Sequence, residues 1–192
     1  STRDWSSDVC SSDLAILERL DPCRTAIFDK TGTLTYGTPK LTEVALVGRL
    51  PEADVLAVAA SLEAYSKHPL AAAVTDAAAA RGVRLLQVEQ LAERPGQGLS
   101  GRVERLNGTA EAHDVVITSR QKLAAVDPAG AATLPPAAGG LECVVVVDGA
   151  AAAVLRFRDA PRPDGRSFVS HLGPAHRLER VMLVSGDRES EV

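Results

Sequence analysis

Two short apolar segments, each running into an acidic residue, constrain the fold of this chain more than any other feature. Thr25–Phe28 leads directly into Asp29, and a stretch rich in glycine and threonine follows. Val181–Val184 leads into Ser185–Asp187 in the same way. Each pattern predicts a buried strand that delivers a carboxylate into a polar loop.

The residues between these two segments follow a different pattern. Pro51–Tyr65, and a second stretch from Pro69 to Arg81, predict two helices because apolar residues recur at helical spacing after an initial proline. The period then moves toward two, which predicts strands. We therefore expect an α/β fold in which a partial Rossmann-like domain is split by an inserted α+β domain, with an antiparallel sheet and a helical hairpin. The expected strands of the insertion are Val83–Val88, Leu99–Leu106, Val115–Thr118, and a hairpin of Val144–Val147 with Ala151–Phe157.

Composition and charge exclude several classes of function. The chain has 192 residues and a formal net charge of −4, which gives no electrostatic footprint for nucleic acid. No run of about 18 uncharged apolar residues occurs, so we expect no segment that spans a bilayer. Cys10, Cys23 and Cys143 show no CxxC spacing, which favours reduced thiols and a cytosolic setting. We expect Cys23 and Cys143 to be small buried side chains.

The first fourteen residues differ from the rest of the chain. Residues 4–14 read DWSSDVCSSDL, without periodicity and without the basic and apolar regions of a signal peptide. One interpretation is a disordered terminus. We favour another, because the string resembles the translation of a common sequencing-library adapter fused in frame to a truncated gene. On that interpretation residues 1–14 are an artefact and the chain is a fragment.

Asp29 is the strongest catalytic candidate. At the carboxyl end of a strand, a carboxylate and loop amides can meet a phosphate and its Mg²⁺, and the carboxylate can attack phosphorus. A lone aspartate could equally cap a turn. Here, however, the string DKTGTLT resembles the phosphorylation signature of P-type ATPases, within the haloacid dehalogenase (HAD) superfamily. The resemblance implies that Asp29 is the phosphorylated nucleophile, that Lys30, Thr31 and Thr33 complete the catalytic loop, and that Asp29 and Thr31 lie at the Mg²⁺ site.

Thr31 distinguishes between two kinds of HAD enzyme. Phosphatases of the superfamily typically carry a second aspartate at this position, which acts as general acid and then as general base. A threonine does not titrate usefully near neutral pH. We therefore expect a phosphoenzyme that hydrolyses slowly, which suits a pump better than a phosphatase.

Two later segments resemble further parts of the same family. Ser185, Gly186 and Asp187 resemble its TGD segment, with Ser185 in the threonine position. Asp159 and Arg162, in RDAPRP, resemble its DxxRP segment. A structural turn would explain either one alone, but their order after DKTGTLT favours the family.

The inserted block carries a signature of its own. EAYSKHPLA and RPGQGLSG resemble the Glu…His-Pro element and the GxG adenine loop of heavy-metal-transporting P-type ATPases. The resemblance implies that Glu63 and His68 contact adenine and that Gly96 and Gly98 let the backbone approach the base. His68 could instead cap the helix that follows it. Thr118-Ser119 stands where the family usually has Gly-Asn or Gly-Ser, which puts that contact in doubt.

These features together predict the organisation of the chain. Residues 15–42 and 153–192 are expected to form an incomplete phosphorylation domain, and residues 43–152 a nucleotide-binding domain. The family's later lysine and GDGxxND segment, its actuator domain and its membrane helices have no counterpart here. We expect uncovered apolar surfaces on the incomplete domain.

The expected function is ATP binding and aspartyl phosphorylation in a heavy-metal cation pump, with ATP and Mg²⁺ as cofactors. The resemblance implies a parent integral membrane protein, with this segment on the cytosolic side and the metal cation carried by the absent membrane domain. Two alternatives stay open. One is a freestanding HAD phosphatase or phosphotransferase, and the other is a non-catalytic nucleotide-binding module.

Overall fold

The chain forms two compact units, each with its own sheet. The computed structural model describes residues 23–94, 98–104, 106, 111–176 and 178–184. The described residues divide into one unit of 23–37 with 161–184 and another of 38–160. The boundaries expected from the sequence, at 42/43 and 152/153, fall inside the two strands that run through the division, β2 (Thr35–Leu46) and β7 (Ala150–Pro161).

The first unit is built on a parallel pair of strands. β1 (Thr25–Asp29) pairs with β8 (Arg180–Val184), and the register sets Asp29 beside Val184. Both strands predicted from the apolar segments are present. They are not buried as predicted, because the unit has little else to cover them: no residue of β1 or β8 is buried. Helix α6 (Gly165–His176), which the sequence analysis did not predict, joins the pair through an edge-to-face contact of Phe28 with Phe168 at 5.8 Å between ring centroids.

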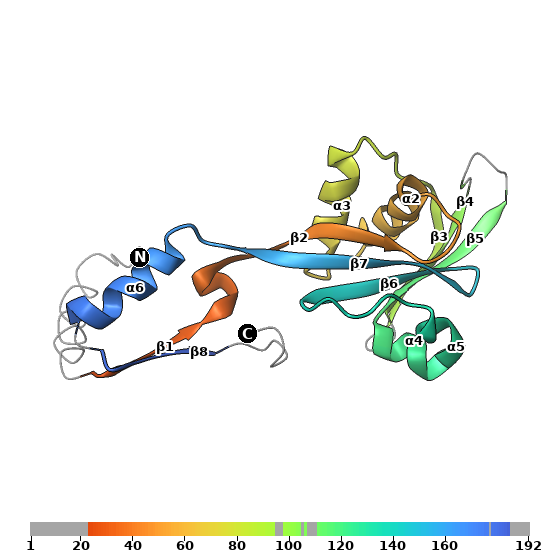
Figure 1. The fold of residues 1–192 in the computed structure, drawn as a ribbon. Helices are drawn as coiled ribbons and strands as arrows, with labels where there is room; N and C mark the ends of the chain where they lie inside the picture. The colour runs from red at the N-terminus through yellow and green to blue at the C-terminus, as the bar shows by residue number, and fades with distance from the viewer. Residues whose placement is uncertain (1–22, 95–97, 105, 107–110, 177, 185–192) are drawn as a thin grey trace, which may run out of the picture. The chain divides into compact units, whose positions relative to one another are not determined.

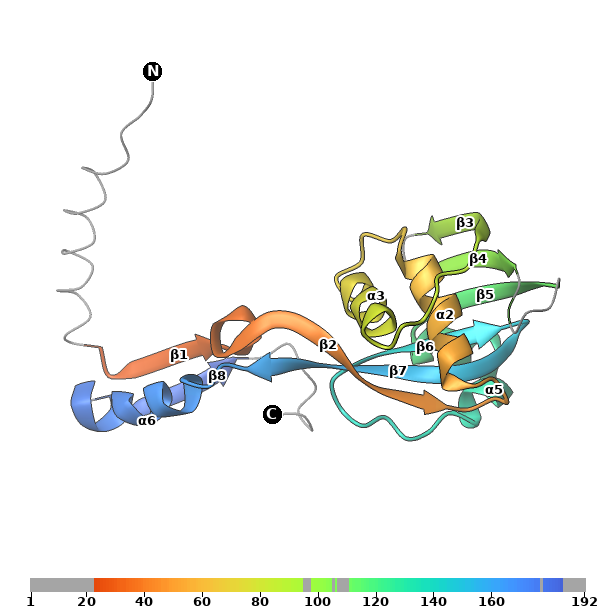
Figure 2. The same ribbon diagram turned by 90° about the horizontal axis from the view of Figure 1, so that it is seen from above.

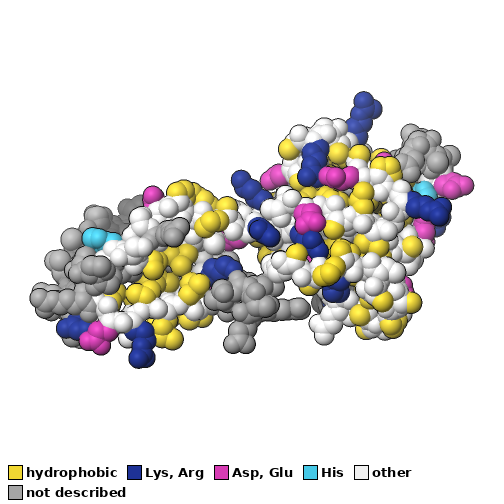
Figure 3. Space-filling model, in the orientation of Figure 1, with side chains coloured by type: hydrophobic (Ala, Val, Ile, Leu, Met, Phe, Trp, Pro, Cys, Tyr) yellow, Lys and Arg dark blue, Asp and Glu magenta, His cyan; other side chains and the backbone are white. Residues whose placement is uncertain are grey.

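This first unit has little core of its own. Thr35 is its one buried residue within the part of the chain that the structure describes, while Ile27 and Val184 are more than half exposed. Figure 3 shows hydrophobic side chains gathered on its surface. Apolar side chains of this unit are thus left uncovered, as expected from the sequence.

The second unit contains a six-stranded sheet in the order β2-β7-β6-β5-β4-β3. Consecutive strands from β3 to β7 pair antiparallel. Asp148-Gly149 closes the β6–β7 hairpin as predicted, and the Asp148 carboxylate accepts a hydrogen bond from the Asp114 N–H at 2.9 Å. The remaining strands are β3 (Val88–Arg94), β4 (Gly98–Glu104), β5 (Ala112–Thr118) and β6 (Leu141–Val147).

Helices cover both faces of this sheet (Figures 1 and 2). On one face lie α2 (Glu52–Glu63) and α3 (Ala71–Ala80), the helical hairpin expected from the sequence. On the other lie α4 (Arg120–Val126), which was not predicted, and α5 (Pro128–Ala132), a single turn in a segment otherwise without regular structure. None of the helices in the described residues is long and apolar enough to cross a membrane.

Alternating side chains of β6 belong to two separate cores. Val145 and Val147 pack in the larger cluster, under α2 and α3, while Val144 and Val146 pack with Leu123 of α4 in the smaller one. This is the period of two expected for a strand buried on both faces. Such a central sheet gives the loops at its ends fixed positions.

One predicted strand is wrong. Val83–Val88 was expected to be extended, but β3 begins only at Val88. The Val83 N–H donates to the Ala78 carbonyl at the end of α3, and the Leu86 N–H donates to the Ser61 hydroxyl at 2.7 Å. These donors are used by a helix end and a side chain, so the segment does not join the sheet at this point.

Ser61 is expected to be a sensitive position of the second unit. It is 1% exposed, donates to the Ala57 carbonyl and accepts from Leu86. Ser61→Ala should lower the free energy of unfolding of the 192-residue chain by about 1–3 kcal/mol, because the Leu86 N–H loses its partner. Urea denaturation followed by circular dichroism measures the loss.

The matched control for this prediction is Thr75→Ala, since the Thr75 hydroxyl bonds only carbonyls of its own helix, Ala71 and Ala72. It should change the free energy of unfolding by no more than about 0.5 kcal/mol. Equal losses in the two variants would contradict the role given to Ser61.

Candidate functional site

A cavity of about 660 Å³ lies in the second unit, where one end of α2 meets the edge of the sheet. Its walls come from the end of α2 and the following loop, from strands β3, β4, β5 and β6, and from α4. Three of the four residues that were predicted to bind nucleotide line it together: Glu63, His68 and Gly98. Gly96, the fourth, lies outside the described residues.

Glu63 is the last residue of α2 and is 6% exposed. Its Oε2 atom is buried and has no hydrogen-bond partner among the residues that the structure describes. Burial raises the pKa of the Glu63 carboxyl to about 7; the nearby Ser66 hydroxyl opposes this rise and the Glu93 carboxylate adds to it. A buried polar atom without a partner is uncommon, and it fits a group whose partner is a ligand.

His68 is held by a short chain of hydrogen bonds. The Nδ1 atom of its ring accepts a hydrogen bond from the Leu70 N–H at 3.2 Å. The backbone N–H of His68 donates to the Ser66 hydroxyl, which in turn donates to Glu93. The contact between the Leu70 N–H and the His68 ring lies in the turn before α3; the N-cap residue of that helix is Leu70, and it makes no side-chain cap hydrogen bond. The contact with the ring occupies Nδ1 only, so the neutral ring carries its proton on Nε2, and His68 is exposed enough for its ring face to meet a ligand.

Gly98 stands where a side chain would not fit. Its φ is +98°, and a Cβ at this position would lie 2.3 Å from the Ile117 carbonyl oxygen and 3.3 Å from the Thr118 Cα. The close approach occurs where β4 pairs with β5. Glycine at 98 thus lets the two backbones meet at the wall of the cavity.

Thr118 and Ser119 also line the cavity. Thr118 is 9% exposed, and the Ser119 hydroxyl accepts from the Lys122 N–H at 3.3 Å as the N-cap of α4. The departure from Gly-Asn or Gly-Ser noted in the sequence therefore sits at the cavity wall. That Thr118 weakens a contact there stays a prediction.

Several cavity residues carry no sequence signal. Glu93, Lys122, Glu142 and Cys143 come from β3, α4 and β6 and belong to no motif, so only the fold brings them together. The Glu142 carboxylate binds the Arg120 guanidinium at 2.6 Å. Burial, followed by the Glu63 and Glu142 carboxylates, raises the pKa of the Cys143 thiol, which is therefore un-ionised.

The other cysteine in the described residues corrects a prediction. Cys23 was expected to be buried, but it is exposed. It lies just before β1, in the unit that has little core to bury it.

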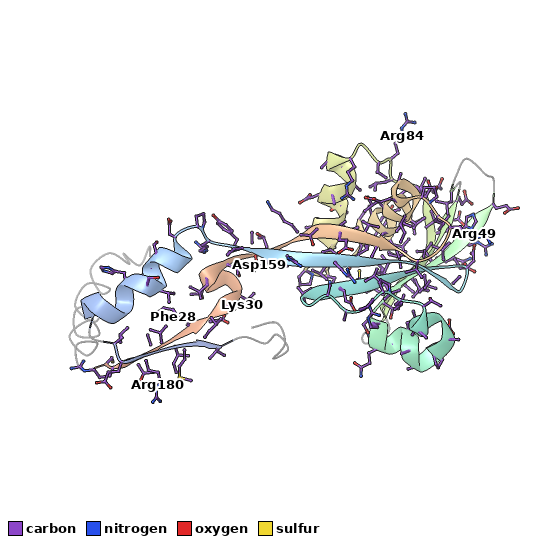
Figure 4. The ribbon with its side chains drawn as sticks, in the orientation of Figure 1. Phe28, Lys30, Arg49, Arg84, Asp159 and Arg180 are labelled. Atoms are coloured by element: carbon purple, nitrogen blue, oxygen red, sulfur yellow. The ribbon has the colours of Figure 1, made fainter. Side chains whose placement is uncertain are left out.

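Asp29 lies at the end of β1 and is exposed. Lys30–Leu34 form a single wide turn after it, in which Gly32 has a φ of +77° (Lys30 is labelled in Figure 4). Thr35 closes the turn: its N–H and hydroxyl both donate to the Lys30 carbonyl, and its hydroxyl accepts from the Gly32 N–H. The role of Thr35 was missed, although it is the last residue of DKTGTLT.

Arg162, which is distant in sequence, also holds this turn through hydrogen bonds. The Arg162 backbone N–H donates to the Leu34 carbonyl at 2.8 Å, and its guanidinium donates to the Thr35 carbonyl at 3.2 Å. The guanidinium also lies 5.3 Å from the centre of the Tyr36 ring. Asp159, labelled in Figure 4, lies in the other unit and accepts from the Thr38 N–H. The DxxRP segment thus holds the ends of β2 and β7.

The remaining predicted catalytic residues can be placed only in part. Thr31 and Thr33 are exposed on the turn. Ser185, Gly186 and Asp187 lie outside the described residues, after β8, whose last residue pairs with Asp29. Asp29 and Thr31 offer oxygen donors of the kind that Mg²⁺ prefers. Within the described ranges, no group of three or more His, Cys, Asp or Glu side chains could hold a metal ion.

Gly98 allows a test of this geometry that needs no ligand. Gly98→Ala should lower the free energy of unfolding by about 3 kcal/mol, because the new Cβ meets backbone that cannot easily move. Gly82→Ala is the matched control, since Gly82 has a φ of +65° but nothing within 4 Å of its Cβ position. It should cost about 1 kcal/mol, from backbone strain alone. Equal costs in urea denaturation would contradict the close approach at Gly98.

Comparison with known proteins gives the family. A sequence model of the haloacid dehalogenase-like hydrolase family matches residues 23–192. A copper-transporting P-type ATPase of Rhizobium leguminosarum bv. viciae is 34% identical over 186 residues, which are 94% of this chain and 21% of that protein. A probable cobalt/nickel-exporting P-type ATPase of Mycolicibacterium smegmatis is 34% identical over 179 residues, with 91% of this chain and 26% of that protein covered.

Solved structures agree with these relatives. The catalytic domain of the CPx-ATPase CopB-B, which changes conformation upon nucleotide binding, superposes with a TM-score of 0.65 and 29% identity, covering 92% of this chain and 59% of that one. The chain thus spans about a fifth to a quarter of the two curated relatives. It belongs to the haloacid dehalogenase-like hydrolase family, and the relatives it matches are metal-transporting P-type ATPases.

Proposed function

We propose that this chain is the ATP-binding and aspartyl-phosphorylation part of a heavy-metal cation pump of the P-type ATPase class. The observation that carries the proposal is the convergence of Glu63, His68 and Gly98 on one cavity. Glu63 and His68 come from a helix end and the loop that follows it, and Gly98 comes from a strand thirty residues further along the chain. If each residue only capped a turn, there would be no reason for all three to line the same cavity.

The nucleotide base is the part of ATP that the cavity suits. The exposed His68 ring offers a face for stacking, and the buried Glu63 carboxyl offers a polar contact to the base edge. The backbone at Gly98 comes close to the cavity because no side chain intervenes. Among the described residues that line the cavity, Lys67 and Lys122 are the only lysines or arginines available to the phosphates, so we expect ADP and ATP to bind with similar affinity.

Phosphoryl transfer is assigned to Asp29. One oxygen of its carboxylate attacks the γ-phosphorus, the bond from phosphorus to the bridging oxygen of ADP breaks, and ADP leaves as an acyl phosphate forms. Asp29 and Thr31 would hold Mg²⁺, which offsets the negative charge of the phosphates. The closed turn at Thr35 and its brace at Arg162 hold the backbone that follows the nucleophile.

The domain assignment belongs to the same proposal. Residues 43–152 are the nucleotide-binding domain, and 15–42 with 153–192 belong to the phosphorylation domain, on the cytosolic side of a membrane protein. The cargo is a heavy-metal cation carried by a membrane domain. Its identity stays open, since one relative is named for copper and another for cobalt and nickel.

Thr31 also weighs against the freestanding phosphatase. It is exposed on the turn after Asp29, where a general acid/base would have to stand, and its hydroxyl cannot serve as one near neutral pH. The non-catalytic nucleotide-binding module is tested by the chemistry of Asp29, described below.

Nucleotide binding is tested with His68→Ala in the 192-residue chain. The variant should lose about tenfold in affinity for ADP by calorimetry, because a base that stacks on the ring loses that contact. His171→Ala, an exposed histidine of α6 in the other unit, is the control and should bind as the wild type does. Unchanged affinity in His68→Ala would contradict the assigned cavity.

Phosphorylation is tested in a full-length protein that carries these residues. γ-labelled ATP should give an acid-stable, hydroxylamine-sensitive adduct, and Asp29→Asn should abolish it without changing nucleotide affinity, since the amide is no nucleophile. Asp164→Asn, an exposed carboxylate before α6, should keep the label. Label that persists in Asp29→Asn would exclude Asp29 as the nucleophile and favour the non-catalytic module.

A further inference from the structure

The Glu63 carboxyl is placed where a negative charge is poorly tolerated. It ends α2, where the carbonyl end of the helix dipole opposes an anion. It is 6% exposed, and no residue in the described part of the chain forms a hydrogen bond with its Oε2 atom. No lysine or arginine nitrogen of the described residues forms an ion pair with it.

The charged groups around the cavity do not compensate for this placement. Glu93 of β3, with Glu142 and Cys143 of β6, lines the cavity beside Glu63, and Lys67, His68 and Lys122 are the basic groups. Arg120, the cation next to the cavity, is already bound to Glu142 through two nitrogens. The cavity residues from β4 and β5 are uncharged.

A carboxyl group forms different hydrogen bonds with a base in its two protonation states. The neutral acid has one acceptor and one O–H donor, whereas the carboxylate has acceptors only. Adenine presents an N6–H donor beside the N1 acceptor, so it pairs with the acid through two hydrogen bonds. Guanine presents two donors, N1–H and N2–H, which pair with the carboxylate instead.

We propose that Glu63 holds the base as a neutral carboxylic acid, with one oxygen accepting from N6–H and the other donating to N1, and that this makes the cavity select adenine over guanine. The inference rests on the proposed nucleotide site and names the residue that sets its specificity. The buried Oε2 atom without a partner is the one that the base would satisfy.

The direction of the pH effect follows from the raised pKa of about 7 at Glu63. Below that pH the acid form prevails and adenine is preferred. Above it the carboxylate forms, loses the contact to N1 and gains one with guanine. The nucleotide phosphates are common to both nucleotides, so any effect of pH on them cancels in the ratio of the two affinities.

The experiment is calorimetry of the 192-residue chain with ADP and with GDP at about pH 6 and about pH 8.5, on either side of the Glu63 transition. The ratio of the ADP to the GDP affinity should fall about tenfold from the lower to the higher pH, as expected for one two-bond contact. Glu63→Gln keeps one acceptor and one donor at every pH, so its preference for ADP should not change. Glu52→Gln, at the exposed start of α2, should behave as the wild type.

The outcomes separate this inference from the proposed function. A wild-type ratio that does not change with pH, while both nucleotides bind, would overturn the role of Glu63 and leave the nucleotide site standing. Failure of the chain to bind either nucleotide would overturn both. The change with pH in the wild-type ratio of ADP to GDP affinity tests the role of Glu63 even if Glu63→Gln does not fold.

Discussion

Burial of helix α2 between the sheet and α3 is the constraint on which the candidate site depends. Every residue from Val55 to Glu63 is buried, so the helix cannot rotate or slide without exposing apolar surface. Ser61 ties the same helix to the segment before β3. Because α2 is fixed, its last residue, Glu63, is held buried at the wall of the cavity.

The phosphorylation turn depends on a different kind of constraint. It has few apolar contacts and is held by hydrogen bonds from Thr35 and Arg162, which lie more than a hundred residues apart in sequence. The strands β2 and β7 bring these two residues to the same place as they leave the large sheet.

The elements predicted correctly from the sequence are those whose signals lie within a few neighbouring residues. The helices after Pro51 and Pro69, the hairpin at Asp148-Gly149 and the strand before Asp29 each carry their signal within a few residues. Where backbone donors are satisfied by distant groups, prediction failed, as at Val83–Val88, where Ser61 accepts from Leu86. Strand β2 was missed because most of its residues are exposed and it contains Pro39, so its sequence resembles that of a loop.

The candidate site shows the same division. Glu63, His68 and Gly98 were found through motifs, whereas Glu93, Lys122 and Glu142 have no local pattern and meet only because β3, α4 and β6 converge. The pairing of Arg120 with Glu142 likewise links a helix to a strand that lies beyond a long loop. Periodicity does not reveal that the Glu63 Oε2 atom has no hydrogen-bond partner among the described residues, since this depends on everything packed around it.

The central claim is that one cavity of the second unit holds the base of a nucleotide. A crystal structure of the 192-residue chain with bound ADP tests it most directly. The account predicts adenine in this cavity, its ring against His68 and its amino edge at the Glu63 carboxyl, with the base close to the backbone at Gly98. Adenine bound elsewhere, with the cavity empty of ligand, would contradict it.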